Sequence, residues 1–219
     1  MPMSNKRHPP PTVSDVEARV LLDRYKCAIP FHEVRTRFLG NIASPGIGES
    51  PIKVIEQLWG GKLPEFESID AANELIGALV MGVWNRLTQH QERNSPFRLT
   101  RVHPAATREG LATLAQIRCQ ELDGFVEGLF GHNESIALPE RAHHGLDTLS
   151  KIRAMFAAVL DVAMDDMKPA TDAAMETTIK LMREMTKNAE TEVNAVVRSC
   201  TIARRQMLPS LLAEKPTLH

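Results

Sequence analysis

Apolar side chains between residues 72 and 87 recur every three or four positions, and this spacing restricts what the chain can fold into. The positions are Ala72, Leu75, Ile76, Leu79, Val80, Val83, Trp84 and Leu87. Such spacing places side chains on one face of an α-helix. Similar stripes follow along the chain, and no segment shows the sustained two-residue alternation of a half-buried strand. We therefore predict an all-α fold with one multi-helix domain.

Helix start and stop signals divide the chain into about seven helices. Ser14, Ser50 and Ser68 suit the N-cap position, and Pro51 suits the first helical position after Ser50. Residues 1–12 are polar, basic and proline-rich, so we expect a flexible tail. A helical domain over residues 13–168 should follow, and then a long C-terminal helix over residues 169–210.

The connector LWGGKLPEFES (residues 58–68) combines turn residues with large aromatic ones. Gly60 and Gly61 can adopt the left-handed conformation that ends a helix. Trp59 and Phe66 have two interpretations: they close the core, or they form a partner surface.

Two further glycines, Gly77 and Gly82, lie within the same helix but off its apolar stripe. Glycine inside a helix is destabilising, so we expect a second backbone to pack closely against both positions.

The C-terminal helix carries a narrow apolar seam that alternates strictly between spacings of three and four. Its members are Ile179, Met182, Thr186, Ala189, Val193, Val196, Cys200, Ala203 and Met207. A seam of this kind pairs with another surface. It could pack along its own subunit, or Ile179, Met182, Val193, Val196 and Cys200 could form the seam of a homodimer.

Composition restricts the class of protein. Basic and acidic residues nearly balance, 26 against 27, so no overall field attracts nucleic acid or an anionic membrane. Three cysteines, Cys27, Cys119 and Cys200, lie far apart and fit free thiols in a reducing cytoplasm. The longest apolar run, residues 75–84, is about half a membrane crossing. We expect a cytoplasmic protein with no membrane span, no cofactor and no catalytic residue.

The chain contains the segments ELDGFVEGLFG (residues 121–131), SPIKVIEQLWGG (residues 50–61) and LPEFESIDAANELIGAL (residues 63–79). Together these three segments resemble the YecA/YgfB-like family of uncharacterised bacterial proteins. The resemblance covers about residues 30–160 and implies an all-helical fold with an interaction or regulatory role. Larger members end in a cysteine-rich zinc module, which this chain lacks, so no metal role is carried over.

Two clusters suggest other functions. A metal site can be drawn from His143 and His144 with the nearby residues His132, Glu134, Glu140 and Asp147. However, adjacent histidines point about 100° apart on a helix. A nucleic-acid surface can be drawn from residues 93–108, which contain Arg93, Phe97, Arg98, Arg101, His103 and Arg108.

Taken together, these patterns favour a non-enzymatic interaction or regulatory protein that binds an unknown protein partner. The expected partner contacts are Trp59, Phe66, Phe97, Arg98 and Arg101. A metal-binding protein or metalloenzyme that uses the region of His143 and His144 is the first alternative. Nucleic-acid binding through residues 93–108 is the second.

Overall fold

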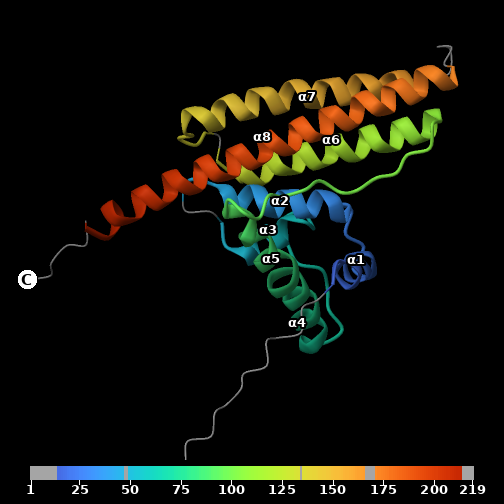
Figure 1. The fold of residues 1–219 in the computed structure, drawn as a ribbon. Coiled ribbons are helices and arrows are strands. Elements are labelled where there is room, and N and C mark those ends of the chain that lie inside the picture. Colours follow the sequence, from blue (N-terminus) through green and yellow to red (C-terminus); the bar gives the residue numbers. More distant parts are fainter. Residues whose placement is uncertain (1–13, 47–48, 134, 166–170, 214–219) are drawn as a thin grey trace, which may run out of the picture.

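The computed structural model describes residues 14–46, 49–133, 135–165 and 171–213, and these are helical with no strand among them (Figure 1). The α-helices are α1 (Asp15–Arg24), α2 (Phe31–Ala43), α3 (Pro51–Gln57), α4 (Ile69–Gly77), α5 (Asn85–Leu87), α6 (Arg108–Phe130), α7 (Glu140–Met164) and α8 (Asp172–Ala213). A π-helix, η1 (Ala78–Trp84), and a 3₁₀-helix, η2 (Thr88–Gln91), join α4 and α5 into one continuous rod. The described residues thus form seven helical segments, and the predicted all-α fold is confirmed.

Helix α6 lies at the centre of the arrangement, in contact with α2, α7 and α8. Helices α6, α7 and α8 lie alongside one another, while α2 packs on the opposite side of α6 (Figure 1). Helices α1, α3 and α4 lie beyond α2, and Phe38 of α2 contacts Trp84 of η1 with ring centroids 5.1 Å apart. Trp84 is buried, as its place on the apolar stripe predicts. Helices α2 and α6 therefore lie between the long helices and the short ones.

The predicted helix starts are confirmed by their caps. Ser14 and Glu17 form a reciprocal capping box at α1. The Ser50 hydroxyl accepts a hydrogen bond from the Lys53 N–H at the start of α3, where Pro51 is the first helical residue. Ser68 caps α4 in the same way. These boundaries are set by local hydrogen bonds, which explains why the sequence alone indicates them.

The connector before α4 closes the core. Gly60 and Gly61 have φ angles of +76° and +97°, as predicted for the end of α3. Trp59 Nε1 donates to the Tyr25 carbonyl oxygen over 2.8 Å, and the Phe66 ring meets the Tyr25 ring edge-on at 5.2 Å. Both predicted partner contacts, Trp59 and Phe66, are thus half-buried against α1 and used within the chain.

Helices α2 and α6 touch backbone to backbone. A Cβ atom on Gly128 would lie 1.9 Å from the Arg37 carbonyl oxygen, and one on Gly40 would lie 2.1 Å from the Phe125 carbonyl oxygen. A Cβ atom on Gly124 would lie 2.8 Å from the Glu33 Cγ and 2.9 Å from the Glu33 carbonyl oxygen. These three glycines allow an approach that any side chain would prevent.

The expectation of such an approach at Gly77 is wrong. A Cβ atom there would meet no heavy atom within 4 Å. The apolar stripe predicts which face of this helix is buried, but it cannot predict which glycine another backbone approaches.

The C-terminal seam packs inside the chain. Side chains of Ile179, Met182, Val193, Val196 and Cys200 are all buried in the single subunit, because α8 lies against α7, α6 and α2. In this structure the five residues therefore pack along their own subunit, which is the first of the two interpretations, and none of them is exposed.

Further along α8, the Arg204 guanidinium fixes the helix to the end of α2. It donates to the carbonyl oxygens of Ile42 and Ser44.

The predicted flexible tail over residues 1–12 lies outside the described residues. Within the described ranges, no helix combines the length and apolar character needed to cross a membrane.

Replacing Gly128 with alanine should destabilise the protein by about 1–3 kcal/mol, because the new methyl group would force α2 and α6 apart. Replacing Gly77 with alanine is the matched control. It should stabilise the protein by about 0.5–1 kcal/mol, because the site is open and alanine favours the helix. Urea unfolding followed by circular dichroism measures both. Equal effects of the two substitutions would contradict the backbone contact.

Candidate functional site

An open groove of about 610 Å³ lies between α6 and α7, and seven apolar side chains line it. We call it the α6–α7 groove. The second half of α6 and the first half of α7 form its walls, and the segment before α7 adds Ser135, Ile136 and Leu138. The apolar lining consists of Leu122, Val126, Phe130, Ile136, Leu138, Leu146 and Leu149.

Local sequence explains why this groove forms. Leu122, Val126 and Phe130 recur every four residues on α6, so they share one face. Helix α6 ends at Phe130, and Pro139 at the N-cap of α7 starts the next helix with an extended backbone. The chain between these helices carries Ile136 past the groove, half-buried, instead of into the core.

The rim of the groove is acidic. Asp123, Glu127 and Asp147 line it together with a single arginine, Arg153. Arg153 donates to both carboxylate oxygens of Asp123, with contacts of 2.8 to 3.3 Å, and this ion pair raises the pKa of Arg153. Three carboxylates against one guanidinium leave the lining with a negative balance.

Glu127 is tied to α2 by Arg37, whose guanidinium also binds Glu33 at 3.0 Å. Burial raises the pKa of Glu33, and the Arg37 guanidinium partly opposes this shift. Asp147 has no ion-pair partner within the described ranges, and its charge is free to meet a ligand.

The predicted metal site is not assembled. His143 and His144 are exposed on α7. His132 lies elsewhere: its Nε2 is 2.7 Å from the Gln57 Nε2 and 3.6 Å from the Glu49 Oε1. Glu134 lies outside the described residues. Among the residues that are described, no group of three or more His, Cys, Asp or Glu side chains could hold a metal ion.

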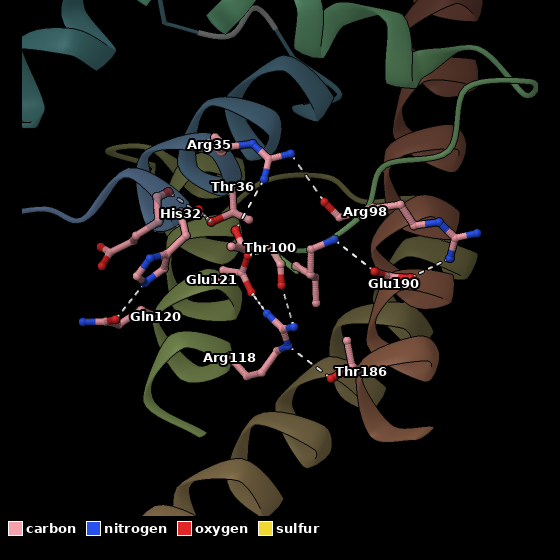
Figure 2. Close-up of polar contacts among 12 residues, drawn as sticks. His32, Arg35, Thr36, Arg98, Thr100, Arg118, Gln120, Glu121, Thr186 and Glu190 are labelled. Atoms are coloured by element: carbon pink, nitrogen blue, oxygen red, sulfur yellow. Dashed lines mark hydrogen bonds and ion pairs between the residues drawn. The ribbon is translucent and has the colours of Figure 1, made fainter. Parts of the chain in front are cut away.

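The arginine-rich segment is held against the body of the protein (Figure 2). We call residues 96–106 the extended segment. The Phe97 backbone exchanges hydrogen bonds with the Asn194 side chain of α8, at 2.8 and 3.0 Å. Arg98 donates to Glu190 over 2.6 Å, and Glu190 also accepts from the Leu99 N–H. The Phe97 ring is fully buried, so its predicted role as a partner contact is wrong.

The remaining arginines of the predicted nucleic-acid surface lie on different parts of the molecule. Arg101 lies beside α1, in a separate cavity that Arg19 also lines. Arg108 donates to the carbonyl oxygens of Val162 and Asp165 at the end of α7. Arg93 lies beside α8. The structure does not bring these side chains together into one patch.

A buried ion pair that the sequence analysis did not identify lies under the extended segment (Figure 2). Glu121 is fully buried and pairs with Arg118 on the same helix. Glu121 also accepts from the Thr100 N–H at 2.7 Å, while Arg118 donates to the Thr100 carbonyl oxygen at 2.8 Å and to the Thr186 hydroxyl at 3.1 Å. An i, i+3 pair of Arg and Glu is common on helices, so only burial distinguishes this one.

The three thiols are poor nucleophiles. Burial raises the pKa of Cys27 and Cys119, and it raises the pKa of Cys200 to about 11. A reactive cysteine has instead a lowered pKa and an exposed sulfur.

Comparison with known proteins gives no match to any family model, curated protein or solved structure. The resemblance to YecA/YgfB-like proteins therefore stays a prediction. The function has to be argued from the geometry of the described residues.

Replacing Glu121 with alanine should cost about 3–5 kcal/mol, because the Arg118 charge would remain buried without its partner. The double variant Arg118→Met/Glu121→Leu should lose less, since it buries no charge. Glu109→Ala, at an exposed position of the same helix, is the control and should change stability by less than about 1 kcal/mol. Urea unfolding measures the stability of all three variants. If Glu121→Ala were as stable as the double variant, Arg118 would not depend on Glu121 as its buried partner.

Cys200 should resist alkylation in the folded protein. At pH 8 a thiol with a pKa of about 11 is ionised in on the order of one molecule in a thousand. Iodoacetamide labelling followed by mass spectrometry should show slow modification of Cys200 in buffer and rapid modification in urea. Equal rates in the two conditions would show that this thiol is neither buried nor shifted.

Proposed function

We propose that this protein acts without catalysis, by binding a partner protein in the α6–α7 groove. The observation that carries the proposal is the combination of an apolar lining with an acidic rim. Val126 is 37% exposed at the groove, although it belongs to the apolar stripe of α6. Exposed apolar side chains that line a concave surface are typical of recognition sites.

The chemistry of the groove indicates the kind of partner. Two helices that lie side by side, with apolar side chains between them, suit an amphipathic helix as a ligand. The apolar side chains of such a helix recur at positions i, i+3, i+4 and i+7. The unpaired Asp147 and the excess of carboxylates favour lysine or arginine at the flanks of that helix. The proposed ligand is therefore a basic amphipathic helix of another protein.

A catalytic function has less support from the described residues. The groove contains two serines and His143, but no hydrogen bond or ion pair joins His143 to a nucleophile or to a carboxylate. Catalysis by a serine or cysteine needs such a base within hydrogen-bond reach. The apolar lining instead supports binding.

Three expectations from the sequence remain proposals. They are a bacterial protein related to the YecA/YgfB-like family, a cytoplasmic location and a homodimer. Because the seam residues of α8 are buried within one subunit, a homodimer would have to use another surface.

The groove should bind a synthetic 18-residue peptide with leucines at helical spacing and lysines at both flanks. Fluorescence anisotropy should show binding by the wild type and binding about tenfold weaker by Val126→Lys, which puts bulk and positive charge into the groove. Val162→Lys is the control, since Val162 is exposed on α7 outside the groove.

A peptide with glutamate flanks should bind more weakly than the lysine peptide. The proposal is wrong if the two peptides bind equally, if neither binds, or if Val162→Lys weakens binding as much as Val126→Lys. Thermal denaturation of both variants confirms that they are folded.

A further inference from the structure

A second concave surface, independent of the α6–α7 groove, concentrates arginines from three separate elements. We call it the arginine pocket. It has a volume of about 560 Å³ and lies where α8 passes the end of η2 and the start of α7. Arg93 follows η2, Arg141 begins α7, and Arg198 and Arg205 belong to α8. These side chains are far apart in the sequence and share one cavity only in the fold.

The charges around the arginine pocket do not cancel. Arg141 pairs with Glu192 at 2.7 Å, and Arg205 pairs with Glu92 at 2.8 Å. The Arg198 Nε donates only to the backbone carbonyl oxygen of Asn194, at 3.3 Å. Within the described residues, Arg93 has no hydrogen bond or ion pair. Four guanidinium groups against two carboxylates leave a local charge of +2.

A buried hydroxyl group in the wall of the pocket also lacks a partner. Thr201 is only 2% exposed, and its Oγ1 forms no hydrogen bond within the described part of the chain. Other threonines of α8 donate to the carbonyl oxygen four residues earlier; they are Thr177, Thr178, Thr186 and Thr191. Thr201 differs from all of these, and it lines the arginine pocket. An unsatisfied buried hydroxyl is costly, and such groups often indicate a missing ligand or water.

We propose that the arginine pocket binds the phosphate group of a small molecule. A phosphate monoester carries nearly two negative charges at neutral pH, which matches the uncompensated charge of Arg93 and Arg198. Guanidinium groups donate in a planar fork that fits phosphate oxygens. No aromatic side chain lines the pocket, so it offers no platform on which a base of single-stranded nucleic acid could stack.

Isothermal titration calorimetry on the full chain at low ionic strength tests the proposal. The probes are inorganic phosphate and glycerol 3-phosphate, with acetate as a monoanionic control. The wild type should bind one phosphate per chain, and Arg198→Gln and Arg93→Gln should each weaken that binding at least tenfold. Arg183→Gln removes the same charge from an exposed position of α8 outside the pocket and should change the affinity less than twofold.

The outcomes separate specific binding from general attraction. Absence of phosphate binding to the wild type overturns the proposal, and so does an equal loss of affinity in Arg183→Gln or equal binding of acetate. Tighter binding of glycerol 3-phosphate than of phosphate would identify an organic monoester as the ligand. Equal binding would identify free phosphate.

Thr201→Val gives a second, independent readout, because it removes only the hydroxyl group. We expect weaker phosphate binding together with an unchanged or higher Tm in the absence of phosphate, since no internal hydrogen bond is lost. A lower Tm with unchanged affinity would show that the hydroxyl group serves the fold and that the pocket wall takes no part in binding.

Discussion

The backbone contact between α2 and α6 is the constraint on which the rest of the structure depends. Gly40, Gly124 and Gly128 leave no room for a side chain between the two helices. Interiors pack at the density of organic crystals, so such a contact fixes the distance and the angle between the helices within narrow limits. Every other element is then positioned relative to this pair: the short helices pack beyond α2, and α7 and α8 pack beyond α6 (Figure 1).

The polar network under the extended segment follows from this arrangement. With α6 fixed, Arg118 and Glu121 are buried beside α8 and must have partners, which Thr100 and Thr186 supply (Figure 2). The segment has no secondary structure of its own. The backbone groups of Phe97, Leu99 and Thr100 bond instead to side chains of α6 and α8. A stretch that looks like a basic binding loop is therefore largely part of the scaffold.

Two surfaces remain available once the core is formed, and they differ in chemistry. The α6–α7 groove carries an excess of carboxylates beside its apolar side chains, while the arginine pocket carries an excess of guanidinium groups. The groove lies between the long helices α6 and α7, and the pocket lies beside the C-terminal part of α8. A basic helix and a phosphate group have opposite charges, so neither ligand suits the other site.

The sequence by itself determined the helical class and the starts of α1, α3 and α4. These depend on local spacing and on caps such as Ser14 and Ser68, which need no distant partner. Only the tertiary structure decided that the α8 seam packs within one subunit, that Phe97 is interior, and that four arginines from three elements share one pocket. The physical reason is that apolar periodicity shows that a face is buried but not what covers it. Likewise, charged side chains far apart in sequence meet only when helix packing brings their backbones together.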